Sequence, residues 1–278
     1  AMNARLPIPK TGVVHGMSNA AYHAHEALSK SQLAKFLICP AQYEGLYLKR
    51  RASVPETASQ RAGTLLHTLV LEPDTFNDRY AVGPDVSRAT KVWKEWEASI
   101  RPGVTAIKGE EYEEAKAQAE SMLLHSDIAE LRKSGHAEAS MFCEDEETGL
   151  WLRVRPDWIH ELPEGLIVLD VKTCDPRPHA FAAQCAKNTY HVQDAMYSDV
   201  IQKATGKPVL AFLFGGVDTN APYLSACYEL DDDSKETGRI QYRRGVTEFA
   251  KCKAENKWPG YDGVRRLSLP RYALETQE

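Results

Sequence analysis

The chain has 278 residues, enough for one large domain with a full hydrophobic core or for two small ones. Its hydrophobic fraction of 43% and charged fraction of 26% are ordinary for a globular protein, and no apolar run approaches the roughly 18 residues that a membrane span needs. The net charge of −5 gives no general affinity for nucleic acid, so a DNA-binding protein of this composition must concentrate its basic residues in one groove.

The cysteines indicate the cellular compartment. Six occur, at positions 39, 143, 174, 185, 227 and 252, and none forms a C-x-x-C pair. Scattered cysteines in a chain with a full core are typical of a reducing cytoplasm, whereas small secreted domains use theirs in disulfides. The spacing also disfavours a zinc site of the usual kind. We therefore expect a cytoplasmic protein without a disulfide framework.

The first half of the chain has a helical pattern. Residues 1–16 are rich in Pro, Gly and polar side chains, which predicts an irregular N-terminal arm, and residues 17–278 are expected to form a single domain. Within that domain, residues 17–134 are expected to be mainly helical. Ser29 or Ser31 can cap a helix that ends before Pro40. Further helices are predicted over 41–50, 57–71, 91–100 and 109–125, with loops over 51–57 and 83–91.

The pattern changes after Gly135, where strand signals begin. Alternating or apolar runs predict strands over 136–144, 150–159 and 165–173, followed by helices over 176–187 and 190–205. Two more strands are predicted over 209–217 and 223–230, and a last helix over 232–256, which begins with an acidic first turn. This order predicts an α/β domain with a mixed sheet flanked by helices, in which residues 135–278 supply the sheet core and the C-terminal helix.

The strand over 165–173 carries two charges on one face. Residues i and i+2 of a strand project together, so Asp170 and Lys172 share a face while Leu169 and Val171 point into the core. Charged side chains on an otherwise apolar strand are costly unless they have partners. For this pair alone, a structural salt bridge is the simpler interpretation.

A second carboxylate changes that balance. Asp157 follows Pro156 at the end of the preceding predicted strand, and a hairpin-like return of the chain would place it beside Asp170. Two adjacent carboxylates repel each other, and a hard divalent cation such as Mg²⁺ relieves the repulsion. An amine nearby, that of Lys172, can then orient or deprotonate a water or stabilise charge in the transition state. Glu138 could add a third carboxylate, although a solvated strand residue is the alternative.

The spacing of these residues resembles a known nuclease signature. Pro156-Asp157, twelve intervening residues and then Asp170-Val171-Lys172 resemble the PD-(D/E)xK motif, which is weak by itself. Three further segments resemble motifs of the RecB-like branch of that superfamily: G-T-L-L-H at 63–67 the upstream G-x-x-x-H, L-D-V-K-T at 169–173 the L-D-x-K-T strand, and Q-D-A-M-Y at 193–197 the Q-x-x-x-Y helix. Four motifs in the correct order are more specific than any one of them.

The resemblance is closest to the RecE-like nucleases, the family of the C-terminal nuclease domain of exonuclease VIII. It extends from about Tyr22 to Arg271 and rests on the segments LSKSQL (28–33), GTLLHTLVLEP (63–73), GHAEAS (135–140), RPD (155–157), DVKT (170–173), YHVQDAMYSD (190–199) and LSLPRY (267–272). It implies a restriction-endonuclease-like fold, in which the mixed central sheet is flanked by helices and preceded by a helical N-terminal elaboration.

The resemblance also implies a metal site. In RecB-like nucleases the motif histidine and the two aspartates bind the metal, with a backbone carbonyl as a further ligand. The corresponding groups here are His67, Asp157, Asp170 and the carbonyl of Val171. His67 lies among leucines, so a core histidine is the alternative to a metal ligand. The implied cofactor is Mg²⁺, with Mn²⁺ as a substitute.

Four other residues receive roles from the same comparison. Lys172 corresponds to the catalytic lysine, which acts with Asp157 and Asp170, and Glu138 matches a catalytic glutamate placed near the lysine or a second metal. Gln193 and Tyr197 match residues that contact the DNA strand and steady the site, and their spacing of four puts them on one helix face. The alternatives are a capping role for Gln193 and core packing for Tyr197.

Some RecB-like nucleases hold an iron–sulfur cluster, but we expect none here. Cys39 lies where the upstream cysteine would be, whereas the C-terminal group of cysteines is missing. Contacts to a 5′-phosphate or to DNA are assigned tentatively to four basic residues, each of which is alternatively a solvated surface charge: Lys30, Arg61, Arg88 and Lys91.

The implied activity is a Mg²⁺-dependent 5′-to-3′ exonuclease that acts on double-stranded DNA ends and leaves 3′ overhangs for recombination by strand annealing. The implied partners are a RecT-like single-strand annealing protein and further copies of the chain in a ring, expected to be a tetramer. The implied location is the bacterial cytoplasm, whether the protein is bacterial or encoded by a phage or prophage. The alternatives are an endonuclease or an exonuclease of opposite polarity on the same core, an inactive DNA-end binding protein and, more remotely, an unrelated α/β metal hydrolase.

Overall fold

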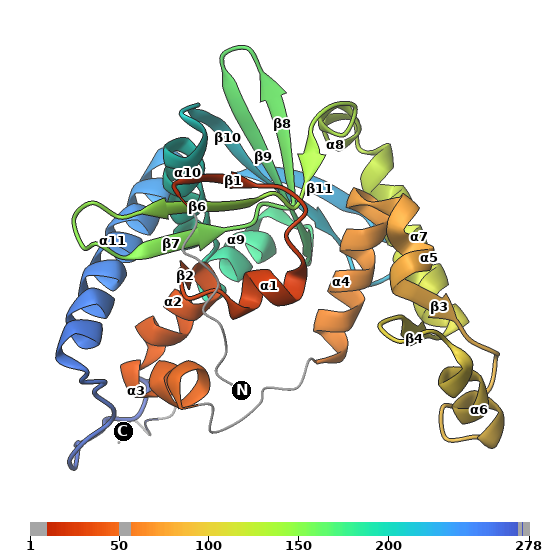
Figure 1. The fold of residues 1–278 in the computed structure, drawn as a ribbon, viewed down its shortest axis with the longest axis horizontal. Helices are drawn as coiled ribbons and strands as arrows, with labels where there is room; N and C mark the ends of the chain where they lie inside the picture. Colours follow the sequence, from red (N-terminus) through yellow and green to blue (C-terminus); the bar gives the residue numbers. More distant parts are fainter. Residues whose placement is uncertain (1–9, 50–56, 272–273, 275–278) are drawn as a thin grey trace.

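The structure is a computed structural model, and it describes residues 10–49, 57–271 and 274. Figure 1 shows a central group of strands with helices on both sides. This arrangement agrees with the mixed α/β fold expected from the sequence. None of the helices in the described part of the chain is long and apolar enough to cross a membrane.

The larger sheet has five strands in the order β11-β10-β9-β8-β5. Its centre is β9 (Gly165–Thr173), which runs antiparallel to β8 (Trp158–Leu162) and parallel to β10 (Val209–Val217). Parallel neighbours require a crossover, and this one is made by α9 (Pro178–Lys187) and α10 (Tyr190–Thr205). The edges are β5 (His136–Ala137) and β11 (Ser225–Glu229), both antiparallel to their neighbours.

A second sheet of four strands has the order β1-β6-β7-β2. Its strands are β1 (Gly12–Val14), β2 (Leu28–Ser29), β6 (Ser140–Glu144) and β7 (Trp151–Val154). The prediction of one strand over 150–159 is therefore wrong, because β7 and β8 belong to different sheets. Arg155, Pro156 and Asp157 separate them, and Pro156 has no N–H with which to continue a ladder.

The predicted strand over 136–144 is divided in the same way. Its first residues form β5 in the larger sheet and its last residues form β6 in the smaller one. Glu138 lies at the break with φ of 47°, a left-handed conformation that interrupts extended backbone. The two breaks lie side by side, since the N–H of Glu138 donates to the carbonyl of Asp157 at 3.2 Å.

Two hydrophobic clusters hold the helices against the larger sheet. Leu169 and Val171 of β9 pack against α4 (Ala58–Leu71), α7 (Gly109–Leu124) and α8 (Ser126–Leu131). Val168 of β9 packs into the other cluster, with residues of α2 (Lys30–Ile38), α10 and α11 (Asp232–Glu255). The alternation along β9 thus buries both faces, as expected for a central strand.

The N-terminal part departs from the sequence expectations in several places. Gly12–Val14 of the expected irregular arm pairs with β6, while residues 1–9 and 50–56, which include most of the expected loop, lie outside the described residues. The helix expected over 41–50 is α3 (Pro40–Tyr43) followed by a π-helix, Glu44–Leu48. The first predicted helix is α2, with Ser29 as its cap in a capping box.

Short elements that the sequence did not predict complete the fold. They are α1 (Asn19–Ala24), a 3₁₀ turn (Pro73–Thr75), α5 (Phe76–Arg79), β3 (Tyr80–Val82), β4 (Thr105–Ile107) and α8. With α6 (Lys91–Ser99), the paired strands β3 and β4 form a lobe that projects from the body (Figure 1).

Candidate active site

The pairing of β8 with β9 brings the two aspartates together. Trp158 faces Leu169 in this antiparallel pair, so Asp157, one residue before Trp158, lies beside Asp170, one residue after Leu169. The Oδ2 atom of Asp157 accepts a hydrogen bond from the backbone N–H of Val171 at 2.7 Å. The hairpin-like return expected from the sequence is therefore present, and it fixes one carboxylate on the strand that carries the other.

Asp170 is almost fully enclosed, at 2% exposure, and both of its oxygens have neighbours. Its Oδ1 accepts a hydrogen bond from the Gln193 side-chain amide at 2.6 Å, and its Oδ2 lies 2.5 Å from Nζ of Lys172. Burial opposes the charged form of Lys172, but the carboxylates of Asp170 and Asp157 outweigh burial and raise the pKa of Lys172 above its usual value. The strand pair is thus a buried ion pair that α10 supports.

His67 reaches the same strand from α4. Its Nε2 lies 3.0 Å from the carbonyl oxygen of Val171, and because that oxygen can only accept, the ring donates from Nε2. In the neutral ring the Nδ1 lone pair then faces Asp157, whose Oδ1 lies 3.6 Å away. Two electron-rich atoms at this separation repel each other unless a proton or a cation lies between them.

The surroundings of Asp157 also favour a positive charge near its carboxylate. Burial raises the pKa of Asp157 to about 6, and the nearby charge of Asp170 adds to this shift, while His67, Lys172 and the Val171 N–H oppose it. Two carboxylates, an imidazole and a backbone carbonyl are donors that suit a hard divalent cation in kind. In the described part of the chain, however, no group of three or more His, Cys, Asp and Glu side chains is arranged to hold a metal.

The Tyr190 ring lies near two amines, those of Lys172 and Lys30. The Nζ of Lys172 lies 5.0 Å from the centre of the Tyr190 ring, and the Nζ of Lys30 lies 5.7 Å from the same ring. Lys30 also donates to the carbonyl of Asn188 at 2.9 Å. Burial, reinforced by the charge of Lys172, lowers the pKa of Lys30 to about 8. Of the four basic residues selected from the sequence, Lys30 is thereby brought to the site.

The other three basic candidates are placed elsewhere or differently. Arg88 binds Glu111 at 2.6 Å, and Lys91 lies 3.5 Å from Glu95 at the start of α6, in the lobe distant from β9 (Figure 1). Arg61 is exposed in the first turns of α4, the helix that carries His67. The structure therefore does not bring Arg88 or Lys91 to the carboxylates.

Glu138 and Tyr197 lie at the margin of the group. Glu138 is tied to Asp157 through its backbone, but its carboxylate is directed to Arg155, with 3.9 Å between Oε2 and Nη1. The Tyr197 ring lies 6.0 Å from that of Phe212, and burial raises the pKa of its hydroxyl well above the usual value. Tyr197 therefore packs against the core, and it lies close enough to the two aspartates for their charges to add to this rise in its pKa.

Sequence reasoning missed Tyr190, whose ring lies near both amines. Its signal was weak, because an aromatic residue at the start of a helix usually indicates core packing. The position three residues before Gln193 was the available clue, since residues three apart share a helix face.

A family of known domains matches the part of the chain that contains this site. A family model described as "PDDEXK-like domain of unknown function (DUF3799)" matches residues 29–265, a range that includes every side chain of the group just described. No curated protein sequence is similar enough to count as a relative.

A solved structure shares the fold at low sequence identity. A protein from Eubacterium rectale described as "Putative exonuclease" has a TM-score of 0.58 and 13% identity, over 91% of this chain and 95% of that one. SSO0001 (TM-score 0.29, 14% identity, 79% of this chain and 85% of that one) and protein VC1899 from Vibrio cholerae (0.24, 11%, 81% and 58%) are too distant in structure to carry an argument.

Proposed function

This chain belongs to the family of PDDEXK-like domains and is a nuclease, and from that premise we propose that it is a Mg²⁺-dependent exonuclease that degrades double-stranded DNA in the 5′-to-3′ direction. The family predicted from the four sequence motifs is thereby confirmed. The observation that carries the proposal is the meeting of Asp157, Asp170, Lys172 and His67 around one short stretch of β9.

Asp157, Asp170, His67 and the Val171 carbonyl would hold the metal. When bound, Mg²⁺ supplies an activated water and stabilises negative charge on phosphate. The fit rests on the facing Nδ1 of His67 and Oδ1 of Asp157, whose repulsion a bound cation would relieve, and on the raised pKa of Asp157 beside a second carboxylate.

The chain's own side chains have distinct tasks in this proposal. The ammonium of Lys172 stabilises the charge that develops on the phosphate oxygens as water attacks. Gln193 orients Asp170 by donating to its Oδ1, so it is a positioning residue in this arrangement. Lys30, which lies near the same Tyr190 ring as Lys172, binds a phosphate of the DNA strand as it enters. Glu138 and Tyr197 remain proposed contributors at the margin.

The direction of digestion, the leaving of a 3′ overhang and the use of that overhang in recombination follow from the RecE-like resemblance. The proposed partners also follow from this resemblance: a RecT-like annealing protein and further copies of the chain in a tetrameric ring. The proposed location, the cytoplasm, has the same basis. A ring would also reconcile the net charge of −5 with DNA binding, because the basic residues would line the channel. The exonuclease name of the Eubacterium rectale protein supports an exonuclease over an endonuclease.

A linear duplex labelled on either the 5′ or the 3′ end tests this proposal. In Mg²⁺ we expect release of the 5′ label first, as mononucleotide, while the 3′-labelled strand stays full length. Early release of the 3′ label would show the opposite polarity, and internal cleavage of a closed circular duplex would show an endonuclease.

An inactive DNA-end binding protein is the second candidate. One observation favours it: Asp170 lies 2.5 Å from the ammonium of Lys172, so its charge already has a partner without a metal. Duplex-end binding without any degradation in Mg²⁺ or Mn²⁺ would select this alternative.

A further inference from the structure

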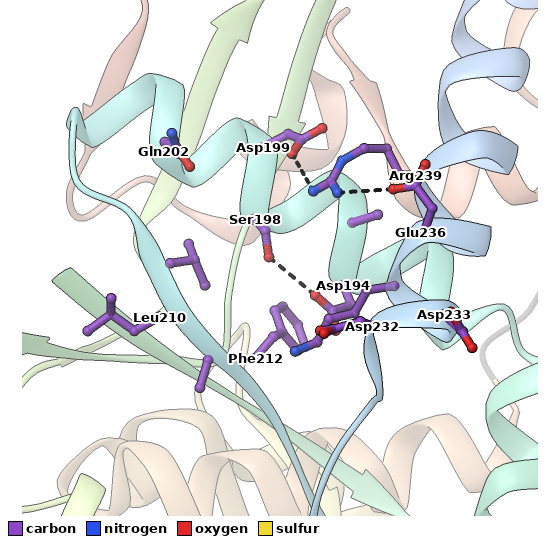
Figure 2. A pocket seen from close by; sticks show the side chains of 14 residues that line it. Asp194, Ser198, Asp199, Gln202, Leu210, Phe212, Asp232, Asp233, Glu236 and Arg239 are labelled. Atoms are coloured by element: carbon purple, nitrogen blue, oxygen red, sulfur yellow. Dashed lines mark hydrogen bonds and ion pairs between the residues drawn. The ribbon is translucent and has the colours of Figure 1, made fainter.

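A cavity of about 480 Å³ lies outside the candidate active site, where α10, the first half of β10 and the start of α11 meet (Figure 2). The two sites are on neighbouring residues of α10: Gln193 faces Asp170, and Asp194 lines the cavity. None of the residues proposed to act in DNA cleavage lines this cavity. We call this cavity, with the strand segment Val209–Phe212 that forms its floor, the edge pocket.

The floor of the edge pocket is a strand edge without a neighbour. β11 pairs with Leu213–Val217 of β10 and ends at Glu229, so among the described residues no strand lies on that side of Val209–Phe212. Leu210 in this segment is 47% exposed. Unpaired strand edges are templates for an added extended segment, and proteins usually cover or block them. This edge has the shape for addition of one more strand.

The walls of the edge pocket are acidic. Five carboxylates line it, and its two basic side chains are already engaged: Arg239 lies 3.1 Å from Asp199 and 3.7 Å from Glu236, and Lys235 binds Glu229 at 2.6 Å. In the described part of the chain no ion pair involves the remaining two surface acids, Asp232 and Asp233. The helix N-terminus of α11 would by itself attract an anion, but these carboxylates make the pocket select for a cation.

Asp194 adds an observation of a different kind. Its side chain is 3% exposed, its Oδ1 accepts from the Ser198 hydroxyl at 3.2 Å, and its Oδ2 is buried with no hydrogen-bond partner among the described residues (Figure 2). A buried carboxylate oxygen without a donor is costly, and such atoms require an explanation in a native structure. A donor brought by a ligand would supply the missing hydrogen bond.

We propose that the edge pocket binds an extended, basic segment of another protein, which adds as a strand along Val209–Phe212 and directs a Lys or Arg side chain toward Asp194 and Asp232. Alternating residues of an added strand point to opposite faces, so every second side chain of the segment would be basic. A bare metal ion is a poorer occupant, because no three carboxylates converge in the described structure. The edge pocket thus recruits a protein partner and leaves the DNA-cleaving site free.

The experiment uses the full chain and a fluorescein-labelled peptide, acetyl-Arg-Val-Lys-Val-Arg-Val-amide, with the Glu-for-Arg/Lys peptide as its charge control. We expect the basic peptide alone to bind, as measured by fluorescence anisotropy. Hydrogen exchange followed by mass spectrometry should show slower exchange of the backbone amides in Val209–Phe212. Binding of both peptides, or protection confined to other segments, would overturn the proposal, as would equally good competition by spermidine, which cannot pair with a strand.

Variants localise the interaction. Asp232→Asn with Asp233→Asn should weaken peptide binding about tenfold or more, because charge-assisted hydrogen bonds are lost. The matched control is Glu110→Gln with Asp127→Asn, two acids in the first turns of α7 and α8, which should bind the peptide as the unchanged chain does. Leu210→Lys should abolish binding and Leu210→Gln should not. All four proteins should retain DNA degradation, which confirms their folding, and equal binding by all four would contradict the proposal.

Discussion

Asp157 is held by the backbone of the strand that carries the second aspartate: its Oδ2 accepts a 2.7 Å hydrogen bond from the N–H of Val171. This contact occurs where β7 and β8 separate around Pro156. The same break that sends the two strands into different sheets therefore brings Asp157 beside Asp170. The carbonyl of the same residue, Val171, faces His67. One residue of β9, Val171, therefore contacts two of the proposed metal ligands through its backbone, Asp157 and His67.

Gln193 should matter more for turnover than for DNA binding. Its amide holds Oδ1 of Asp170 at 2.6 Å, so Gln193→Ala frees that carboxylate to rotate, and we expect kcat to fall roughly 10- to 100-fold with little change in KM for duplex ends. Gln202→Ala, on an exposed turn of the same helix, is the control and should leave kcat unchanged. A rise in KM alone would show that Gln193 acts mainly as a DNA contact.

Lys30 should have the opposite kinetic signature. Lys30→Ala removes an amine placed to bind phosphate, so KM for DNA should rise about tenfold while kcat falls less. Lys35→Ala, in the last turn of the same helix, serves as the control for a lost positive charge. If Lys30→Ala and Lys35→Ala have the same KM in steady-state assays, Lys30 does not contact DNA.

The pH dependence of KM follows from the same amine. Burial lowers the pKa of Lys30 to about 8, so its positive charge is present below that value and is lost as pH rises through it. We expect KM for duplex ends to increase between pH 7 and pH 9 in the unchanged protein. In Lys30→Ala this increase should be absent, and a persistent increase would assign the titration to another group.

Asp194 should destabilise the folded chain at neutral pH. Burial raises its pKa to about 6 from a usual 3.8, so the folded state favours the protonated form. Its contribution to stability is complete below about pH 4 and is lost as pH rises through 6. Asp194→Asn should therefore be more stable than the unchanged chain at pH 7.5, by roughly 1–3 kcal/mol in urea unfolding, with the difference vanishing near pH 4. If the difference in stability between Asp194→Asn and the unchanged chain is the same at pH 4 and pH 7.5, the account is contradicted.

The sequence predicted best those elements whose local signals agree with the tertiary structure. The bounds of β9, α10 and β10 match the predicted ranges 165–173, 190–205 and 209–217, because apolar runs and the glycine that ends α10 mark them clearly. The divided strands at Glu138 and Pro156 were missed because the alternation of side chains continues across each break. Which sheet a strand joins is decided by long-range pairing, which local alternation does not encode.

The residues of the candidate site also differ in how well the sequence predicted their positions. Asp157, Asp170 and Lys172 lie on paired strands, so spacing and strand geometry placed them correctly relative to one another. Lys30 and Tyr190 meet only because α2 packs against the start of α10, and nothing within either segment predicts that contact. Arg88 and Lys91 looked equally suitable as basic residues, yet the lobe that carries them places both away from β9.

Asp170→Asn tests the central claim most directly, with Asp175→Asn as the matched control. Asp175 is a partly exposed aspartate just beyond β9 that pairs with Arg177. Degradation of linear duplex DNA in Mg²⁺ is measured together with duplex binding and thermal unfolding. The account predicts that Asp170→Asn loses at least about 10³-fold in cleavage rate, since it removes a metal ligand, and that it still folds and binds DNA. Asp175→Asn should cleave normally. Cleavage by a folded Asp170→Asn protein at the rate of the Asp175→Asn control would contradict a metal-dependent nuclease site on β9.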